Sequence, residues 1–152
     1  MRIKASLFRW LINLWPPLLF SGIRVSRVSE DYRELDVRLT LRFWNRNTHG
    51  SHFGGSLFAM TDPFYALMLA QILGPGYVIW DKAATIDFRA PGRGTVTAHF
   101  RLDEARIEGI RQETADGRKH FPEFAVDVVD QSGTIVASVH KTLYVRHRRT
   151  TA

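Results

Sequence analysis

The feature that most constrains the fold is an almost unbroken apolar stretch between Gly54 and Gly74. Hydrophobic side chains fall on every side of a helix drawn over it, namely Leu57, Phe58, Met60, Phe64, Leu67, Met68, Leu69, Ile72 and Leu73. A helix that is apolar all round has no face that suits water, so it must be buried. Gly74 followed by Pro75 is a typical helix end. The stretch therefore predicts a buried helix that the rest of the chain has to cover.

The cover is predicted to be a β-sheet. Apolar and polar residues alternate in five segments, 33–43, 83–89, 95–102, 121–130 and 134–146. Alternation with period two is typical of half-buried antiparallel strands. We expect turns at 91–94, between the second and third of these strands, and at 130–133, between the last two. A short helix is expected from Asp103, as its N-cap, to Thr114.

The order of these elements excludes a parallel sheet, because strands and helices do not alternate along the chain. We predict an α+β fold in which an antiparallel sheet of about five to six strands wraps around one long apolar helix. A chain of 152 residues suits one such domain, expected over 21–147 and followed by a basic tail at 148–152. Since one sheet covers only one side of the helix, the chain is expected to self-associate into a dimer or tetramer.

Residues 1–20 form a separate N-terminal segment. Its apolar run is interrupted by Arg9 and Asn13 and ends at Pro16-Pro17. The run is shorter than the roughly 20 residues that cross a bilayer, and it lacks the cleavage site of a signal peptide. It predicts a short amphipathic helix packed on the domain or on a partner. The alternative is a helix lying on a membrane surface, which would give a weak membrane contact.

The charge and the lack of cysteine exclude several classes of function and of site. The net charge is +6, and Lys and Arg are scattered without a nucleic-acid-binding motif, so no nucleic-acid partner is expected. The chain has no Cys, which excludes a disulfide scaffold, a thiolate zinc site and a cysteine nucleophile. The lack of Cys fits a cytoplasmic location. No spacing of His, Asp and Glu suggests metal ligands, so no metal is expected.

Candidate catalytic groups are concentrated in the polar loop 45–56, which leads into the apolar helix. Gly54 and Gly55 stand at the junction, where helix N–H groups lack partners and could stabilise the oxyanion of a thioester. The alternative is that the two glycines only allow a tight loop. His49 and His52 could orient this loop or act in acid–base catalysis.

Asp62 is a carboxylate within the apolar helix. An unpaired buried charge is costly, so this group must be paired, protonated or turned toward a cleft. In a cleft it could act as a general base or a nucleophile. Alternatively, Asp62-Pro63 is the N-cap and first residue of a helix that starts there, with 54–61 irregular. Two further charges, in Trp80-Asp81-Lys82, interrupt a strand pattern and are expected to pair with each other or with a neighbouring subunit.

The string NTHGSHFGGSLFAMTDPF and the predicted architecture resemble the hotdog-fold acyl-CoA thioesterase superfamily, in particular its phenylacetate-pathway branch. Within that branch the chain is similar to a bacterial family of hotdog domains of unknown function. The resemblance extends from about Val25 to Arg146. In this branch a His-Gly-Gly loop leads into the helix, and an acidic residue lies nine positions after the His. Here Phe53 stands in place of that His, and Asp62 is the acidic residue.

The resemblance implies hydrolysis of an apolar acyl-CoA, with coenzyme A entering only as part of the substrate. It implies that Gly54 and Gly55 are oxyanion donors and that Asp62, as base or nucleophile, faces the Gly-Gly loop of a second subunit. Asn47 belongs to the matching loop, and His52 or His49 would have to supply the role of the missing His.

Phosphates of coenzyme A need basic partners, for which Arg89 and Arg93 are the candidates. Because Phe53 replaces the loop His, two other functions stay open. One is a non-enzymatic acyl-CoA or lipid-binding module. The other is a dehydratase or hydratase, which would need a His paired with the helix acid across the subunit interface.

Overall fold

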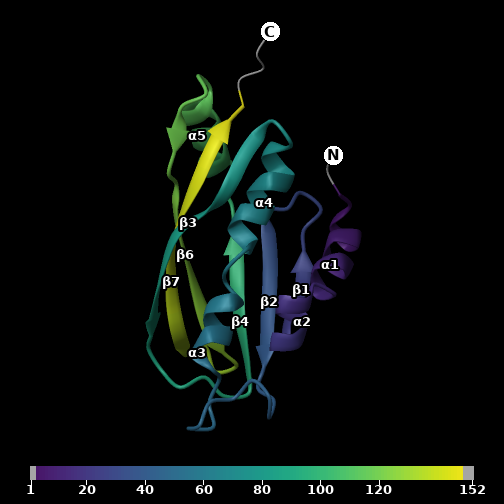
Figure 1. The fold of residues 1–152 in the computed structure, drawn as a ribbon, viewed down its shortest axis with the longest axis vertical. Helices are drawn as coiled ribbons and strands as arrows, with labels where there is room; N and C mark the ends of the chain where they lie inside the picture. Colours follow the sequence, from purple (N-terminus) through teal and green to yellow (C-terminus); the bar gives the residue numbers. More distant parts are fainter. Residues whose placement is uncertain (1–2, 149–152) are drawn as a thin grey trace.

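The computed structural model describes residues 3–148 of the chain (Figure 1). Its elements, in order, are α1 (Ala5–Asn13), α2 (Pro16–Ser21), β1 (Ile23–Val28), β2 (Glu34–Thr40), α3 (Gly54–Ala59), α4 (Phe64–Leu73), β3 (Tyr77–Phe88), β4 (Thr95–Arg101), α5 (Glu104–Thr114), β5 (Lys119–His120), β6 (Glu123–Asp130) and β7 (Ile135–His147). The strands form one antiparallel sheet in the order β1-β2-β4-β6-β7-β3, and β5 pairs with β7.

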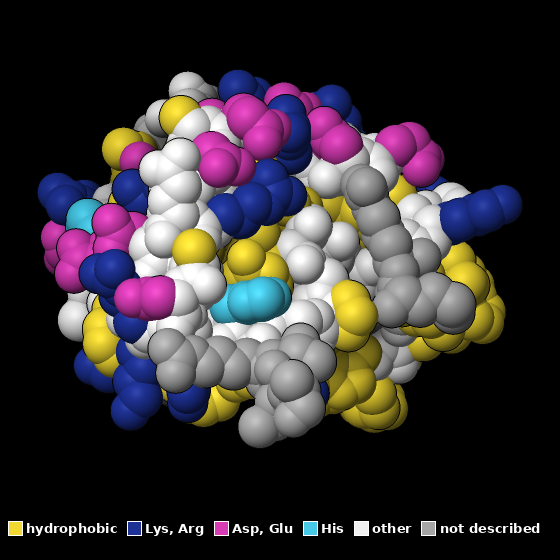
Figure 2. All heavy atoms as spheres, turned by 90° about the horizontal axis from the view of Figure 1, so that it is seen from above, with side chains coloured by type: hydrophobic (Ala, Val, Ile, Leu, Met, Phe, Trp, Pro, Cys, Tyr) yellow, Lys and Arg dark blue, Asp and Glu magenta, His cyan; other side chains and the backbone are white. Residues whose placement is uncertain are grey.

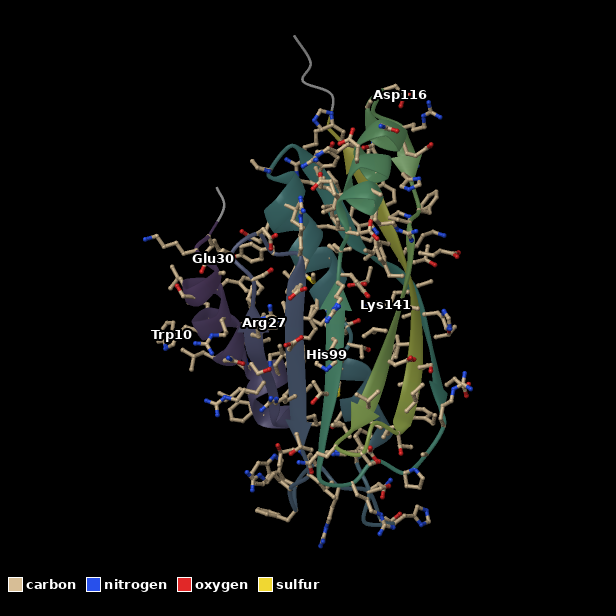
Figure 3. The ribbon with its side chains drawn as sticks, turned by 180° about the vertical axis from the view of Figure 1, so that it is seen from behind. Trp10, Arg27, Glu30, His99, Asp116 and Lys141 are labelled. Atoms are coloured by element: carbon tan, nitrogen blue, oxygen red, sulfur yellow. The ribbon has the colours of Figure 1, made fainter. Side chains whose placement is uncertain are left out.

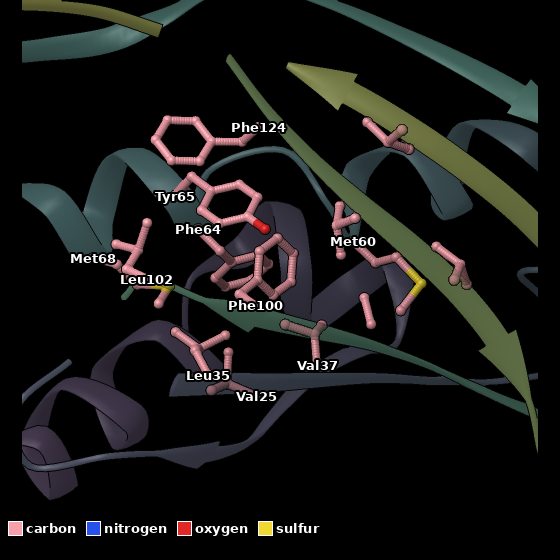
Figure 4. Packing of buried hydrophobic residues seen from close by; sticks show 14 of the residues in the cluster. Val25, Leu35, Val37, Met60, Phe64, Tyr65, Met68, Phe100, Leu102 and Phe124 are labelled. Carbon is pink, nitrogen blue, oxygen red and sulfur yellow. The ribbon is translucent and has the colours of Figure 1, made fainter. Parts of the chain in front are cut away.

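The sheet curves around α3 and α4, which lie along one face of it (Figure 1). The centre of the core is aromatic (Figure 4). Tyr65 stacks on Phe124 with ring centroids 4.6 Å apart, and Phe100 contacts both Tyr65 and Phe64. This arrangement confirms the predicted α+β fold. Segment Gly54–Leu73 is long and apolar enough to cross a membrane, but Phe64 is fully buried inside the protein, as expected of a core helix.

The apolar helix is not continuous. It is interrupted at residues 60–63, where Pro63 has no N–H to donate to the preceding turn. The alternative in which 54–61 is irregular is wrong, because α3 occupies Gly54–Ala59. Asp62 is also not the cap of α4, since Pro63 holds the N-cap position and no side chain caps the helix. Gly74 ends α4, and Asp103 caps α5 by accepting from Arg106 N, both as predicted.

Several strand predictions need correction. The strand expected at 33–43 ends at Thr40, and Phe43, predicted to face the core, is 78% exposed. The strand expected at 83–89 begins at Tyr77 and continues through Asp81 and Lys82, but its register with β7 is irregular between Asp81 and Ala83. The segment 89–94 does not close a hairpin, because β3 lies at the sheet edge and β4 in its middle. β1 was not expected: its pattern is only six residues long and alternates weakly.

The N-terminal segment packs on the domain. α1 ends at Asn13 and the Pro16-Pro17 pair begins α2, while Phe8 and Leu18 join the main core. Asn13 covers the sheet edge at β1: its Nδ2 donates to Val25 O (3.0 Å), and its Oδ1 accepts from Val25 N (2.8 Å). The side chain thereby satisfies edge groups that another strand could otherwise bind. Met1, Arg2 and tail residues 149–152 lie outside the described residues.

Candidate active site

One cavity of about 450 Å³ brings together most of the predicted site residues. It lies between the loop before α3 and the segment after β3, and we call it the loop cavity. Its lining includes Asn47, His49, His52, Gly54, Leu57, Phe88, Arg89 and Arg93. The loop expected to carry the chemistry and the arginines expected to bind phosphate therefore share one cavity, although some 40 residues of chain separate them.

Asn47 organises the loop. Its Oδ1 accepts from the backbone N–H of His49 (2.9 Å) and Ser51 (3.1 Å). Its Nδ2 donates to Ser51 Oγ (2.9 Å) and to His52 O (3.3 Å). With both ends of the amide engaged in loop contacts, the observed role of Asn47 is to hold the loop in shape.

His52 joins the loop to the segment that follows β3. Only 2% of the residue is exposed, and its Nε2 lies 3.0 Å from Gly94 O. A carbonyl can only accept, so Nε2 carries the proton and the buried Nδ1 has none. Burial lowers the pKa of His52 more than the bond to Gly94 raises it, which keeps the imidazole neutral. A Cβ at Gly92 would lie 3.2 Å from His52 Cδ2 and 2.9 Å from Val136 Cγ1, so this close approach requires glycine.

Gly54 and Gly55 begin α3, as the loop-to-helix pattern predicts. The N-cap residue is Phe53, which makes no side-chain cap bond, and the helix offers no acceptor to its first N–H groups. Both glycines lie under aromatic rings. A Cβ at Gly54 would lie 2.9 Å from Phe88 Cζ, and one at Gly55 would lie 2.4 Å from Phe53 Cε1. Phe53, which replaces the loop His, therefore covers the start of the helix.

Asp62 does not line the loop cavity. It lies with Gly55, Phe58 and Trp15 in a second cavity of about 340 Å³, which we call the helix cavity, and its side chain is 60% exposed. Gly54 lines one cavity and Gly55 the other, so the start of α3 separates them. Within one chain the candidate base and the candidate phosphate-binding arginines are thus not brought together.

A buried lysine, missed by sequence reasoning, holds the break between α3 and α4. The side chain of Lys141, on β7, is fully buried in the middle of the molecule (Figure 3). Its Nζ donates to Asp62 O and lies 3.4 Å from Thr61 O and from Asp62 Oδ1. These carbonyls follow α3 and have no helical partner, so Lys141 supplies the donor they need. It thereby fixes the backbone at Asp62.

Asp81 on β3 balances this buried cation. Lys141 Nζ lies 2.7 Å from Asp81 Oδ1, which corrects the prediction that Asp81 pairs with Lys82 or with another subunit. Lys82 instead lies over the ring of Phe121. Burial raises the pKa of Asp81, while Lys141 acts in the opposite direction. One sequence signal could have revealed Lys141: it occupies an inward position of β7, between Val139 and Leu143, where an unpaired charge is excluded.

The described residues contain no candidate metal site. Across residues 3–148, no group of three or more His, Asp or Glu side chains is placed to hold a metal ion.

Comparison with known proteins identifies the family of this chain. A family model described as a domain of unknown function (DUF4442) matches residues 4–145. No curated protein matches the chain in sequence.

Solved structures share the fold at low sequence identity. A Pseudomonas aeruginosa protein of unknown function, described as a probable thioesterase, has a TM-score of 0.86 at 22% identity and covers 97% of this chain and 99% of its own. A Haemophilus influenzae thioesterase has a TM-score of 0.71 at 14% identity, covering 100% and 97%. An Escherichia coli protein from the phenylacetic acid degradation operon has a TM-score of 0.64 at 21% identity, covering 96% of both chains. The chain belongs to the DUF4442 family and is built on the hotdog fold of these thioesterase-type structures.

Proposed function

We propose that this protein is a thioesterase that hydrolyses an apolar acyl-CoA to the free acid and coenzyme A. The loop cavity carries the proposal, because it combines the first amide of α3, at Gly54, with Arg89 and Arg93. A helix N–H without an acceptor suits the oxyanion of a thioester, and arginine suits phosphate. Leu57 and Phe88 add apolar surface to the lining.

In the proposed reaction, Asp62 takes a proton from a water that attacks the thioester carbonyl. The N–H groups of Gly54 and Gly55 stabilise the oxyanion of the tetrahedral intermediate. The C–S bond then breaks to release the free acid and the thiolate of coenzyme A, and the protonated Asp62 returns its proton to the thiolate. The test is release of free thiol by metal-free protein from short, medium, long and aryl acyl-CoAs. Activity on at least one class supports the proposal, and no release from any class contradicts it.

The site is proposed to need two copies of the chain. Gly54 and Asp62 line different cavities, which the start of α3 separates, whereas a general base must reach its proton directly or through one water. Asp62 of a second copy could supply the base. The partly exposed apolar residues Phe58 of α3 and Ala66 and Leu67 of α4, and the long edge strand β3, support this pairing. Light scattering is expected to give a dimer or tetramer mass, and a monomer that retains full activity would contradict it.

A non-enzymatic acyl-CoA-binding module is the second candidate, favoured by the ring of Phe53 over Gly55. If that ring blocks the oxyanion position, acyl-CoA would bind without being hydrolysed. Saturable binding of an acyl-CoA without thiol release would support this candidate. The cytoplasmic location stays a prediction for both functions.

Replacing Arg89 and Arg93 together by Gln is expected to raise the KM for acyl-CoA about tenfold while leaving kcat nearly unchanged. Both side chains line the loop cavity, and a charge-assisted bond to phosphate is worth about 1.5–3 kcal/mol before solvent screening. The matched control uses an acyl-N-acetylcysteamine thioester, which lacks the phosphates, and its KM should not change. An equal rise for both substrates would refute phosphate recognition by these arginines.

A further inference from the structure

Helices α1 and α2 present an apolar surface that the domain does not cover. Phe8 of α1 packs inward against Tyr32, with ring centroids 5.4 Å apart. The opposite face of α1 shows the helical spacing i, i+3, i+4 and i+7 and is about half exposed, at Leu7, Trp10, Leu11 and Leu14. Trp10 points away from the sheet (Figure 3). A soluble helix normally turns its polar face outward, so this second apolar face needs a partner.

The apolar surface continues over α2 into the neighbouring loop. Phe20, in α2, is 76% exposed, and Phe43 and Trp44 are the exposed tip of the loop after β2. Asn45 Nδ2 donates to Ser21 O (3.3 Å), which holds that loop against the end of α2. Residues from α1, α2 and the loop thus form one surface, which we call the N-terminal apolar surface.

Basic residues predominate in the sequence segments that contribute to this surface. Segments 1–29 and 37–61 contain eight Lys and Arg and no Asp or Glu, whereas the rest of the chain contains 13 basic and 15 acidic residues. Arg9 and Arg24 line a groove of about 640 Å³ together with Trp10. On the side where α1 lies, hydrophobic side chains gather at the surface beside a projecting basic side chain (Figure 2). Within residues 3–148, Arg9 and Arg24 form no ion pair, although Arg27 on the same strand as Arg24 pairs with Glu34 (2.6 Å). The apolar surface is therefore bordered by at least two cations that no carboxylate neutralises.

The charge distribution indicates which kind of partner binds the N-terminal apolar surface. In a symmetric contact between two copies, the same patch would face itself and bring like charges together. An anionic lipid bilayer offers both phosphates for the cations and an apolar interior for the aromatic side chains. We propose that the N-terminal apolar surface binds the surface of an anionic membrane, with the exposed face of α1 and the tip at Phe43 and Trp44 inserted at the headgroup level. This inference does not depend on the proposed hydrolase activity.

The test is sedimentation of the full chain with vesicles of phosphatidylcholine alone and of phosphatidylcholine with phosphatidylglycerol. The protein should bind the phosphatidylglycerol vesicles at least tenfold more strongly, with binding that weakens as salt is added. Replacing Trp10 and Phe20 by Ala should lower the binding about tenfold or more, and replacing Arg9 and Arg24 by Gln should remove the preference for anionic lipid.

The control variants Phe121→Ala and Arg118→Gln remove an exposed aromatic and an exposed cation far from this surface, and both should bind like the original chain. Circular dichroism would show that each variant folds. Equal binding to both vesicle types, or none, would overturn the proposal. A second outcome would also overturn the proposal: the original chain does not bind vesicles, and replacing Trp10 and Phe20 lowers the oligomeric mass. The surface would then be a contact with another protein chain.

Discussion

Turnover of acyl-CoA is expected to fall at least a hundredfold in Asp62→Asn, with folding intact. General base catalysis contributes about 10²–10⁴ to the rate of such a reaction, and an amide cannot accept the proton. The side chain of Asp62 is 60% exposed, and Lys141 donates to its backbone carbonyl, which the substitution keeps. The longer contact of Lys141 Nζ with Asp62 Oδ1 (3.4 Å) can be made by the amide oxygen of Asn as well. The measurement is kcat from thiol release, together with a melting curve for each protein.

Asp103→Asn is the matched control, because Asp103 is the true helix cap and lies outside both cavities. Asn caps about as well as Asp, so neither stability nor turnover should change. Asp62→Ala should lose activity as completely as Asp62→Asn. Its free energy of unfolding should not fall by the roughly 0.5–2 kcal/mol that the loss of a helix cap costs, because Asp62 is not a cap. Turnover at the original rate in Asp62→Asn would remove Asp62 from the mechanism, whatever the fold.

Local patterns in the sequence were enough to predict much of the fold. The buried helix follows from side chains that are apolar on every side, since burial is the only environment that suits them. Asp103 was predicted because a capping bond joins residues three apart and needs no knowledge of the sheet. The alternation in 95–102 likewise reports directly on a strand with one buried face. These features depend on neighbours within one or two turns of chain.

The remaining features depend on strand order, which local patterns do not contain. β3 pairs with β7, and this register places Asp81 opposite Leu143 and hence close to Lys141. Nothing between residues 81 and 141 in the sequence signals that pair. For the same reason, local patterns do not show that Asp62 shares a cavity with Gly55 while Gly54 lines the loop cavity. The spacing of nine residues after Phe53 identifies Asp62 as the acidic residue. It does not show whether Asp62 faces the loop of its own chain or that of a second copy.

Lys141→Met is expected to lower the free energy of unfolding by about 3 kcal/mol at neutral pH. Removing one partner of a buried pair leaves the other charge uncompensated, and Asp81 is mostly buried. Met keeps the length of the side chain, so the loss measures charge and hydrogen bonding rather than volume. Urea denaturation provides the measurement, with Lys82→Met, an exposed lysine on β3, as the control that should change little.

The pH dependence of the stability loss in Lys141→Met tests whether the charge of Asp81 causes it. In the original chain Lys141 opposes the rise that burial imposes on the pKa of Asp81, so its removal raises that pKa further. A carboxyl whose folded pKa exceeds its unfolded value favours folding when protonated, and this contribution is lost as pH rises through the folded pKa. The variant should therefore come closer to the original stability near about pH 4 than at neutral pH. A deficit that does not change with pH would mean that the charge of Asp81 is not its source.

Adding Asp81→Leu to Lys141→Met separates the two roles of the lysine. Replacing both members of a buried ion pair by apolar residues is often close to neutral, so the part of the loss that comes from the stranded carboxylate should be recovered. The carbonyls of Thr61 and Asp62 would still lack the donor that Lys141 supplies. If that donor positions Asp62, the double variant regains stability but keeps a reduced kcat, with KM little changed. Recovery of both stability and kcat would show that Lys141 only neutralises Asp81.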